Sequence, residues 1–414
     1  MQSYLHPTVL LRGTLKLRLM NTRITDGIVI AGGGLAGQRC AETLRRSGYD
    51  GRIRMLCAEP HRPYDRPPLS KDLLTGEHPV DGLHYRGAEW YEQQQIELML
   101  GISATRMWPS ERRIDLSDGS SLRYQKVLIA TGSRPRMLPL LSGHDNVSVL
   151  RTVDDSRELA QILSARPRLA VLGAGFIGQE VAATARKLGC EVVMIEAAPC
   201  PLHAILGPEL GGWFTRLHRD HGVEVLNETT VSGLDVNGSI RGLRLSNACL
   251  VPVDHVVVGI GVEPDVAWLA GSGLGHERGV PVDPHGRTES EHVFAVGDAA
   301  ATFDPMLGSH VPGSHWEAAG RQGARAARAM LGLDPGTVPR TSFWTDQYDI
   351  RIQYLGHARL ADAVEIDSDP DEPGFTATFT RAGRAVAALL VDRPRSLPAA
   401  RKLIENGVTH DVPG

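Results

Sequence analysis

Gly27-Ile-Val-Ile-Ala-Gly-Gly-Gly-Leu-Ala-Gly37 is the stretch that decides the fold of this chain. Its first half is a short apolar run that predicts a buried strand, and its second half has the G-x-G-x-x-G spacing of a glycine turn. Helical spacing follows from Leu35 to Ser47, and a second strand is expected from Ile53 to Ala58. The stretch therefore predicts a βαβ unit.

The glycines of this turn have separate physical tasks. Gly32 permits the tight turn, Gly34 lets the backbone approach a pyrophosphate, and Gly37 lets the helix pack closely on the strand. The first turn of the helix then offers oriented N–H groups to the phosphates. Glu59 follows Gly37 by 22 residues, at the expected end of the second strand, where a carboxylate can bind ribose hydroxyls. We therefore expect a dinucleotide site here.

The same pattern occurs a second time at Gly173-Ala-Gly175-Phe-Ile-Gly178. It follows an apolar run from Leu169, and it precedes a helix expected to reach about Leu188 and a strand expected at Glu191–Ile195. Glu196 stands 18 residues after Gly178, and an acid there favours the free 2′-hydroxyl of NADH over the 2′-phosphate of NADPH. The second unit is therefore predicted to bind NADH.

Two dinucleotide sites in one chain point to a tightly bound flavin and a passing nicotinamide nucleotide, that is FAD and NADH. The fold class expected is α/β, with two Rossmann-like dinucleotide-binding domains and a small α+β domain after the composition changes near Asp334. The division expected is an N-terminal extension at 1–26, an FAD-binding domain at 27–140 and 265–335, an NAD-binding domain at 141–264, and the C-terminal α+β domain at 336–414.

Composition excludes several classes of function. The 414 residues carry a net charge of −4, which favours neither nucleic acid nor a membrane surface as a partner. No apolar run reaches the roughly 18 residues that a spanning helix needs. The five cysteines form no close pairs, so a reducing cytoplasm is expected, with neither disulfides nor metal ligands. The oligomeric state is not readable from these features.

The first 26 residues differ from the remainder. They are basic up to Asp26 and lack a continuous apolar region. We interpret them as an upstream start, with Met20 as an equally natural beginning, and a targeting peptide is the alternative. A turn-rich acidic stretch at Asp367–Pro373 is expected to be an exposed loop.

With these motifs in place, the chain resembles the ferredoxin reductases of bacterial oxygenase systems, within the wider glutathione-reductase-like flavoproteins. The resemblance runs from Gly27 to about Asn406, and its most specific piece is Arg62-Pro-Tyr-Asp-Arg-Pro-Pro-Leu-Ser-Lys71. Further matching pieces are Ala130-Thr-Gly-Ser-Arg-Pro135, Leu150-Arg-Thr152, Gly261-Val-Glu-Pro264, Val296-Gly-Asp298 and Phe343-Trp-Thr-Asp-Gln-Tyr348.

The resemblance implies roles for individual residues. Lys71 matches a lysine beside the flavin ring, paired with the glutamate that corresponds to Glu180. Asp298 matches a residue that binds the ribityl chain, and Trp316 matches a position packed by the flavin ring, although a core-filling role remains the alternative. The usual Arg and Glu just before Trp316 are replaced by Val311-Pro-Gly-Ser314, a departure from the family. The cofactor-binding set is completed by Arg66 and Arg151, which match FAD-contacting arginines, and by Ala36, Ala104, Thr131, Gly132 and Gly261.

Cysteine is absent from the segment where disulfide reductases of this superfamily carry their redox thiols, which is Pro67–Lys71 here. Electrons are therefore expected to leave singly, to a protein or a quinone. The family resemblance implies that the acceptor is a [2Fe–2S] ferredoxin of plant or Rieske type that feeds a dioxygenase or a cytochrome P450. Rubredoxin, a quinone or a non-enzymatic NADH-sensing role remain the alternatives. Three arginines at helical spacing are interpreted as a solvated helix face, with ferredoxin docking as the alternative: Arg321, Arg325 and Arg328.

Overall fold

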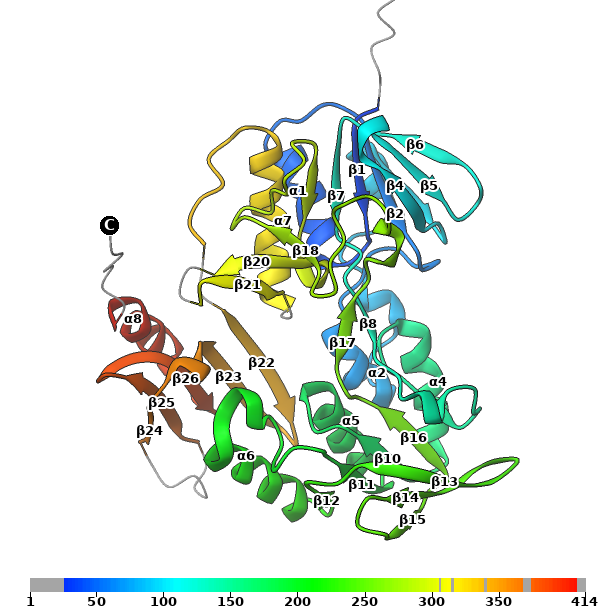
Figure 1. The fold of residues 1–414 in the computed structure, drawn as a ribbon, viewed down its shortest axis with the longest axis vertical. Helices are drawn as coiled ribbons and strands as arrows, with labels where there is room; N and C mark the ends of the chain where they lie inside the picture. Colours follow the sequence, from blue (N-terminus) through cyan, green and yellow to red (C-terminus); the bar gives the residue numbers. More distant parts are fainter. Residues whose placement is uncertain (1–25, 305–306, 314–315, 339–340, 368–373, 408–414) are drawn as a thin grey trace, which may run out of the picture.

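The computed structural model describes residues 26–304, 307–313, 316–338, 341–367 and 374–407. Most of the expected N-terminal extension, the acidic segment 368–373, Ser314 and His315 lie outside these residues. Figure 1 shows two units above one another, with a third beside them at the C-terminal end of the chain. The expected α/β fold class with a C-terminal α+β domain is confirmed.

The first unit is built on a five-stranded parallel sheet in the order β19-β7-β1-β2-β3. Helices α1 and α7 pack on each other and on one face of this sheet, and small sheets cover the other face. Its strands and main helices are β1 (Ile28–Ala31), β2 (Ile53–Cys57), β3 (Ile96–Leu100), β7 (Lys126–Ile129), β19 (Val293–Ala295), α1 (Leu35–Arg46), α2 (Asp72–Thr75), α3 (Ala88–Gln93) and α7 (Trp316–Met330). Strand β19, far away in sequence, pairs directly with β7.

The second unit repeats this architecture. Its parallel sheet has the order β12-β11-β10-β16-β9, and a three-stranded antiparallel sheet packs beside it. The elements are β9 (Val147–Ser148), β10 (Arg168–Leu172), β11 (Glu191–Ile195), β12 (Glu224–Leu226), β16 (His255–Val258), β13 (Val231–Asn237), β14 (Ser239–Leu245), β15 (Leu250–Pro252), α4 (Val153–Ser164), α5 (Phe176–Lys187) and α6 (His203–Asp220). Two antiparallel strands, β8 (Ser133–Pro135) and β17 (Val262–Pro264), carry the chain between the two units (Figure 1).

Two small sheets of the first unit have no strong signal in the sequence. They are β4 (Ala104–Trp108), β5 (Arg113–Leu116) and β6 (Ser121–Arg123), and β18 (Val280–Val282), β20 (Ala300–Asp304) and β21 (Ser309–Pro312). Their apolar side chains close the second face of the parallel sheet, next to Val29 and Val127.

The C-terminal unit is an antiparallel sheet in the order β22-β23-β26-β25-β24, with its own helix α8 on one face and α6 of the second unit packed on the other. Its elements are β22 (Ser342–Gln347), β23 (Ile350–Gly356), β24 (Ala363–Ile366), β25 (Thr376–Arg381), β26 (Arg384–Val391) and α8 (Leu397–Gly407). Tyr348 and Asp349 form a two-residue turn between β22 and β23, with φ of 51° and 67°, which matches the twist of a hairpin. Within the described residues, no helix has the length and apolar character required to cross a bilayer.

Candidate active site

The first glycine turn has the geometry of a phosphate cradle. Gly32 has a φ of 126°, and a Cβ there would lie 2.0 Å from the carbonyl oxygen of Ala130. A Cβ on Gly37 would lie 2.1 Å from the oxygen of Gly32, whereas one on Gly34 would meet nothing within 4 Å. Gly34 is the N-cap residue of α1, so no side chain of the cap residue occupies the N–H groups of the first turn. The residues present therefore fit the diphosphate of a dinucleotide such as FAD.

The second turn reproduces this cradle on α5. Gly173 has a φ of 94° and Gly178 packs on it, while a Cβ on Gly175 would meet only the Gly259 oxygen at 4.0 Å. Glu196, after β11, accepts hydrogen bonds from the N–H of Ala174 at 2.6 Å and of Ala198 at 2.7 Å. The predicted acid is thus fixed beside the predicted glycine turn, and this site fits a second dinucleotide.

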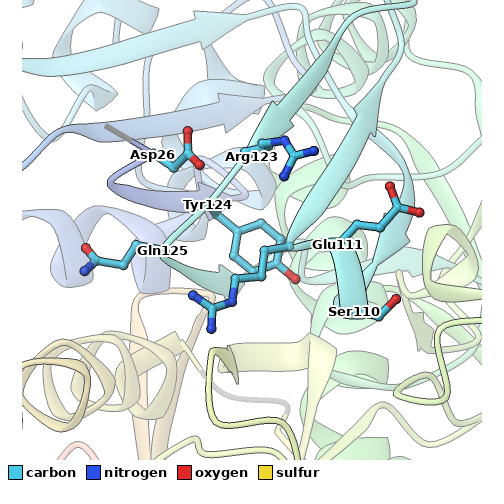
Figure 2. Close-up of a pocket in the computed structure, with 7 residues that line it drawn as sticks. Asp26, Ser110, Glu111, Arg123, Tyr124 and Gln125 are labelled. Carbon is cyan, nitrogen blue, oxygen red and sulfur yellow. The ribbon is translucent and has the colours of Figure 1, made fainter. Parts of the chain in front are cut away.

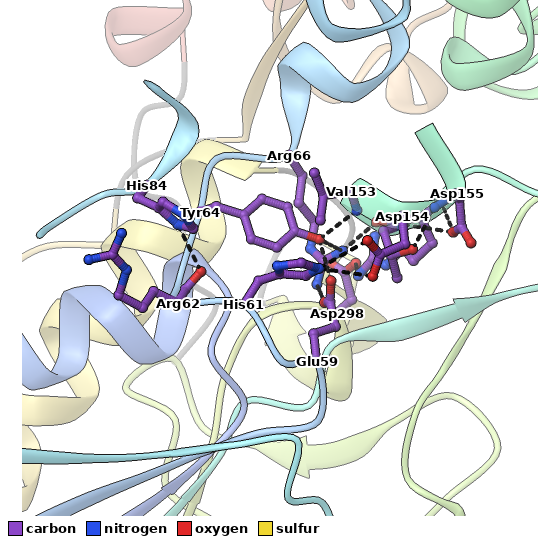
Figure 3. A network of polar contacts seen from close by, with 12 residues as sticks. Glu59, His61, Arg62, Tyr64, Arg66, His84, Val153, Asp154, Asp155 and Asp298 are labelled. Atoms are coloured by element: carbon purple, nitrogen blue, oxygen red, sulfur yellow. Dashed lines mark hydrogen bonds and ion pairs between the residues drawn. The ribbon is translucent and has the colours of Figure 1, made fainter. Parts of the chain in front are cut away.

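Figure 3 shows the predicted FAD residues Glu59, Arg66 and Asp298 joined into one network. Glu59 Oε1 pairs with Arg66 Nη2 at 2.7 Å and its other oxygen accepts a hydrogen bond from Tyr64 at 2.5 Å. Arg66 donates to the carbonyl oxygen of Arg151, whose Nη2 lies 3.3 Å from Asp298 Oδ2. Burial raises the pKa of the Tyr64 phenol, so it remains a donor to Glu59 at neutral pH.

Residues that the sequence did not single out complete this network. Ser133 Oγ donates to Asp298 Oδ2 at 2.7 Å, and the Tyr64 hydroxyl accepts a hydrogen bond from the N–H of Val153 at the start of α4. Burial, together with the nearby Arg66 cation, lowers the pKa of Arg151. Two arginines and two carboxylates are therefore held close together where the first unit meets α4.

Lys71 and Glu180, predicted as partners, form a salt bridge of 2.8 Å with side chains 16% and 5% exposed. Glu180 Oε2 also accepts a hydrogen bond from Ser70 Oγ at 2.5 Å, and Glu180 Oε1 accepts one from Thr345 Oγ1 at 2.7 Å. Thr184, one turn along α5, donates to the carbonyl oxygen of Ser70 at 2.7 Å. The first unit, α5 of the second unit and β22 of the C-terminal unit therefore meet at one buried carboxylate.

Sequence reasoning missed Ser70, Thr184 and Thr345. Ser70 and Thr345 lie inside stretches that carry the family resemblance. The resemblance therefore identified these segments but gave no role to the two side chains. Thr184 stands one helical turn after Glu180, which is the only signal that could have identified it.

Trp316 begins α7 and is partly buried, outside the core clusters. Its Nε1 donates to Asp65 Oδ1 at 2.7 Å, and its ring meets Trp344 of β22 edge-on with a centroid separation of 5.1 Å. Tyr85 donates to the same Asp65 oxygen at 3.0 Å. Trp316 therefore bridges the first unit and the C-terminal unit, and its contact with the flavin ring stays a prediction.

The remaining predicted cofactor residues lie in three different places. Thr131 donates to the oxygen of Asp265, and a Cβ on Gly132 would lie 3.1 Å from Arg151 Nη2, so this turn borders the arginine network. Ala36 and Ala104 instead pack on the two core clusters of the first unit. Gly261 has a φ of 102° and accepts a hydrogen bond from Arg136 N–H.

One interpretation of α7 is wrong. Arg325 is buried, only 8% exposed, and its Nε has no hydrogen-bond partner among the described residues. Helix α7 contacts α1 and also β22, so it does not present one open face to solvent. Arg321 pairs with Glu317 on the same helix, and Arg328 donates to the oxygen of Asp334. The three arginines therefore do not form one solvated face, and Arg325 is not available for docking.

An open cavity of about 390 Å³ lies elsewhere, lined by Asp26, Ser110, Glu111, Arg112, Arg123, Tyr124 and Gln125 (Figure 2). Asp26 precedes β1 and Gln125 precedes β7, so this cavity lies at the amino ends of the parallel strands. Ligands of such sheets bind beyond the carboxyl ends, where the glycine turns are. Among the described residues, no group of three or more His, Cys, Asp or Glu side chains is arranged to hold a metal ion.

Comparison with known proteins gives a consistent result over most of the chain. Residues 26–323 match the pyridine nucleotide-disulphide oxidoreductase family, and residues 342–413 match the reductase C-terminal family. The ferredoxin–NAD(+) reductase component of the anthranilate 1,2-dioxygenase system of Burkholderia cepacia is 39% identical over 93% of this chain and 96% of its own. Putidaredoxin reductase of Pseudomonas putida is 31% identical over 92% of each chain.

Solved structures show the same likeness. The reductase in the covalent putidaredoxin reductase–putidaredoxin complex superposes with a TM-score of 0.89, at 31% identity, over 92% of this chain and 94% of that one. An NADH:rubredoxin oxidoreductase from Clostridium acetobutylicum, at 20% identity and a TM-score of 0.74, shares the fold.

Proposed function

The chain belongs to the pyridine nucleotide-disulphide oxidoreductase family, and from this premise we propose that it is an FAD-dependent NADH:ferredoxin reductase that feeds an oxygenase. When bound, FAD supplies a ring system that accepts a hydride from NADH and releases the two electrons one at a time. The observation that carries the proposal is the buried Lys71–Glu180 salt bridge, which joins the two dinucleotide units.

The residues of this chain supply charge and position. Glu180 holds the Lys71 ammonium in place. Its positive charge can therefore stabilise the electron-rich reduced flavin ring without a movement of the side chain during the reaction. Arg66, Arg151 and Asp298 are the side chains proposed to hold the FAD, and Glu196 is proposed to bind the NADH ribose. Hydride transfer needs no acid or base from the protein, so positioning is the main contribution of these side chains.

Thiol chemistry finds no support in the structure. Burial raises the pKa of the Cys57 thiol to about 12 and also raises that of Cys40, so neither is a nucleophile near neutral pH. A one-electron acceptor agrees with the curated relatives, which are named as reductase components of dioxygenase systems and as putidaredoxin reductase. We therefore propose a [2Fe–2S] ferredoxin as the partner of this chain.

We infer that residues 27–140 and 265–335 form the FAD-binding domain, 141–264 the NAD-binding domain and 336–414 the C-terminal domain. The pairing of β19 with β7 supports the discontinuous FAD domain. The five cysteines are free thiols, which supports a reducing cytoplasm as the compartment.

The proposal is tested by mixing the FAD-loaded protein anaerobically with NADH or NADPH and following the flavin absorbance by stopped flow. Cytochrome c reduction is then measured with and without a [2Fe–2S] ferredoxin. Fast bleaching by NADH and cytochrome reduction that requires ferredoxin are expected. Ferredoxin-independent reduction of a quinone, or slow bleaching into a lasting charge-transfer band, would contradict the proposal.

A further inference from the structure

A line of polar side chains, from the half-buried Tyr348 to the buried His218 and Gln179, connects the C-terminal domain to the second glycine turn. Tyr348, in the turn between β22 and β23, has its hydroxyl 2.7 Å from Nδ1 of His218 on α6. Nε2 of His218 lies 3.2 Å from Oε1 of Gln179 on α5. Nε2 of Gln179 donates to the carbonyl oxygen of Ala174 at 2.9 Å. The line therefore ends on a peptide of the Gly173–Gly175 turn.

The hydrogen bonds in this line all run in one direction. The oxygen of Ala174 can only accept, so Gln179 presents its amide N–H₂ there and its oxygen to His218. His218 must then donate from Nε2, which leaves Nδ1 to accept the hydroxyl hydrogen of Tyr348. One neutral tautomer of His218 satisfies every contact.

Burial makes the line rigid. Gln179 and His218 are both 0% exposed. Burial lowers the pKa of His218 to about 4, against the opposing effect of the neighbouring Gln347 amide, so the imidazole is neutral at pH 7. A buried polar line of this kind is costly to break because each lost bond leaves a partner unsatisfied.

Ala174, at the end of the line, is held through both of its peptide groups. Its carbonyl oxygen, in the peptide to Gly175, accepts from Gln179, while its N–H, in the peptide from Gly173, donates to Glu196 at 2.6 Å. Glu196 is the residue proposed to bind the NADH ribose. A shift of Ala174 would therefore move both the glycine turn and its acid.

We propose that Tyr348, His218 and Gln179 are positioning residues for NADH, through which the C-terminal domain fixes the second glycine turn. This inference rests on the proposed function, because it takes that turn as the NADH site. The Tyr348 ring also stacks on His221 with a centroid separation of 3.8 Å and an interplanar angle of 12°. Removing only the hydroxyl therefore leaves the packing of the ring in place.

The test compares Tyr348→Phe with Tyr354→Phe in the FAD-loaded protein. Tyr354 is a matched control, since it is a buried tyrosine of the same domain whose hydroxyl bonds to the N–H of Ala358 and is not part of the line. Binding of 1,4,5,6-tetrahydro-NAD, a non-reducing analogue of NADH, is measured by calorimetry, and KM and kcat for NADH are measured separately. Tyr348→Phe is expected to weaken analogue binding and raise KM about tenfold, with kcat and FAD content unchanged.

A second variant, Gln179→Met, removes the last two bonds of the line, to His218 and to Ala174, while keeping the length of the side chain. It is expected to weaken analogue binding similarly, and the double variant Tyr348→Phe/Gln179→Met is expected to add little to either single change. Wild-type binding by Tyr348→Phe, equal losses in both tyrosine variants, or fully additive losses in the double variant would each overturn the inference. Failure of the wild-type protein to oxidise NADH would instead refute the proposed function.

Discussion

Thr345 of β22 donates a hydrogen bond of 2.7 Å to Glu180 of α5, on the same carboxylate oxygen that pairs with Lys71 at 2.8 Å. The two partners are 165 residues apart in the sequence. The C-terminal domain therefore takes part in fixing the charged pair proposed to lie by the flavin. Removing this contact is therefore expected to slow the proposed flavin reduction while leaving the protein folded.

The variant Thr345→Val removes the hydroxyl and keeps the side-chain volume. We expect a loss of about 1 kcal/mol in the free energy of unfolding and a roughly fivefold slower flavin reduction by NADH, because Glu180 loses one of its donors. Stopped-flow reduction and chemical unfolding measure the two effects. Thr345→Ser is the matched control, because it retains the hydroxyl, and a rate as slow as that of Thr345→Val in this variant would show that the hydroxyl does not set the rate.

Replacing Lys71 by Met is expected to have a larger effect. It leaves Glu180 as a buried carboxylate without its cation, which costs about 3 to 5 kcal/mol of stability. Flavin reduction is expected to slow at least about tenfold, since the fixed positive charge is lost.

The double variant Lys71→Met/Glu180→Gln serves as the control for Lys71→Met. It removes both charges, so most of the lost stability is expected to return while flavin reduction stays slow. Urea unfolding and stopped flow separate the two effects. If the double variant regained the full rate of reduction, the charge of Lys71 would have no role in the reaction.

The two βαβ units were predictable from the sequence because their glycines are required by local geometry. Gly32 and Gly173 both have positive φ and no room for a Cβ, so only glycine fits these two turn positions. The glycine motif in the sequence therefore predicts the turn. Strands β1, β2, β10 and β11 accordingly lie within one or two residues of the expected positions. The small sheets of the first unit were not predicted, because their short strands carry little periodicity and are fixed by packing on the parallel sheet.

The candidate site was predictable in part. Lys71 and Glu180 were identified through the family resemblance, but Thr345 and Tyr348 act across domain boundaries that periodicity does not encode. Arg325 illustrates the same limit, since its spacing on α7 predicts an exposed side chain although the folded chain buries it. Contacts between distant segments are decided by tertiary packing, for which one sequence gives no pattern.

Glu196 is expected to determine nucleotide choice. In Glu196→Gln the negative charge that would repel a 2′-phosphate is lost, so the preference for NADH over NADPH should fall about tenfold, a change of about 1.4 kcal/mol. The ratio of kcat/KM for the two nucleotides measures it. The control is Glu191→Gln, which changes an exposed glutamate at the start of β11, the strand that Glu196 follows. An unchanged ratio in Glu196→Gln would remove Glu196 from the nucleotide site.

Stability is expected to fall in mild acid because of two buried histidines. Burial lowers the pKa of His218 and of His255 to about 4, while an unfolded chain titrates near the ordinary value of 6.5. Above pH 6.5 both states are neutral and stability is at its full value. Between pH 6.5 and 4 only the unfolded state gains these protons, so each histidine lowers the free energy of unfolding by about 1.4 kcal/mol per pH unit.

Urea unfolding at pH 7.5 and 5.0 measures the loss of stability, and His255→Gln should reduce this loss by about half. Equal stability of the wild-type protein at the two pH values would show that neither histidine is held neutral by the fold.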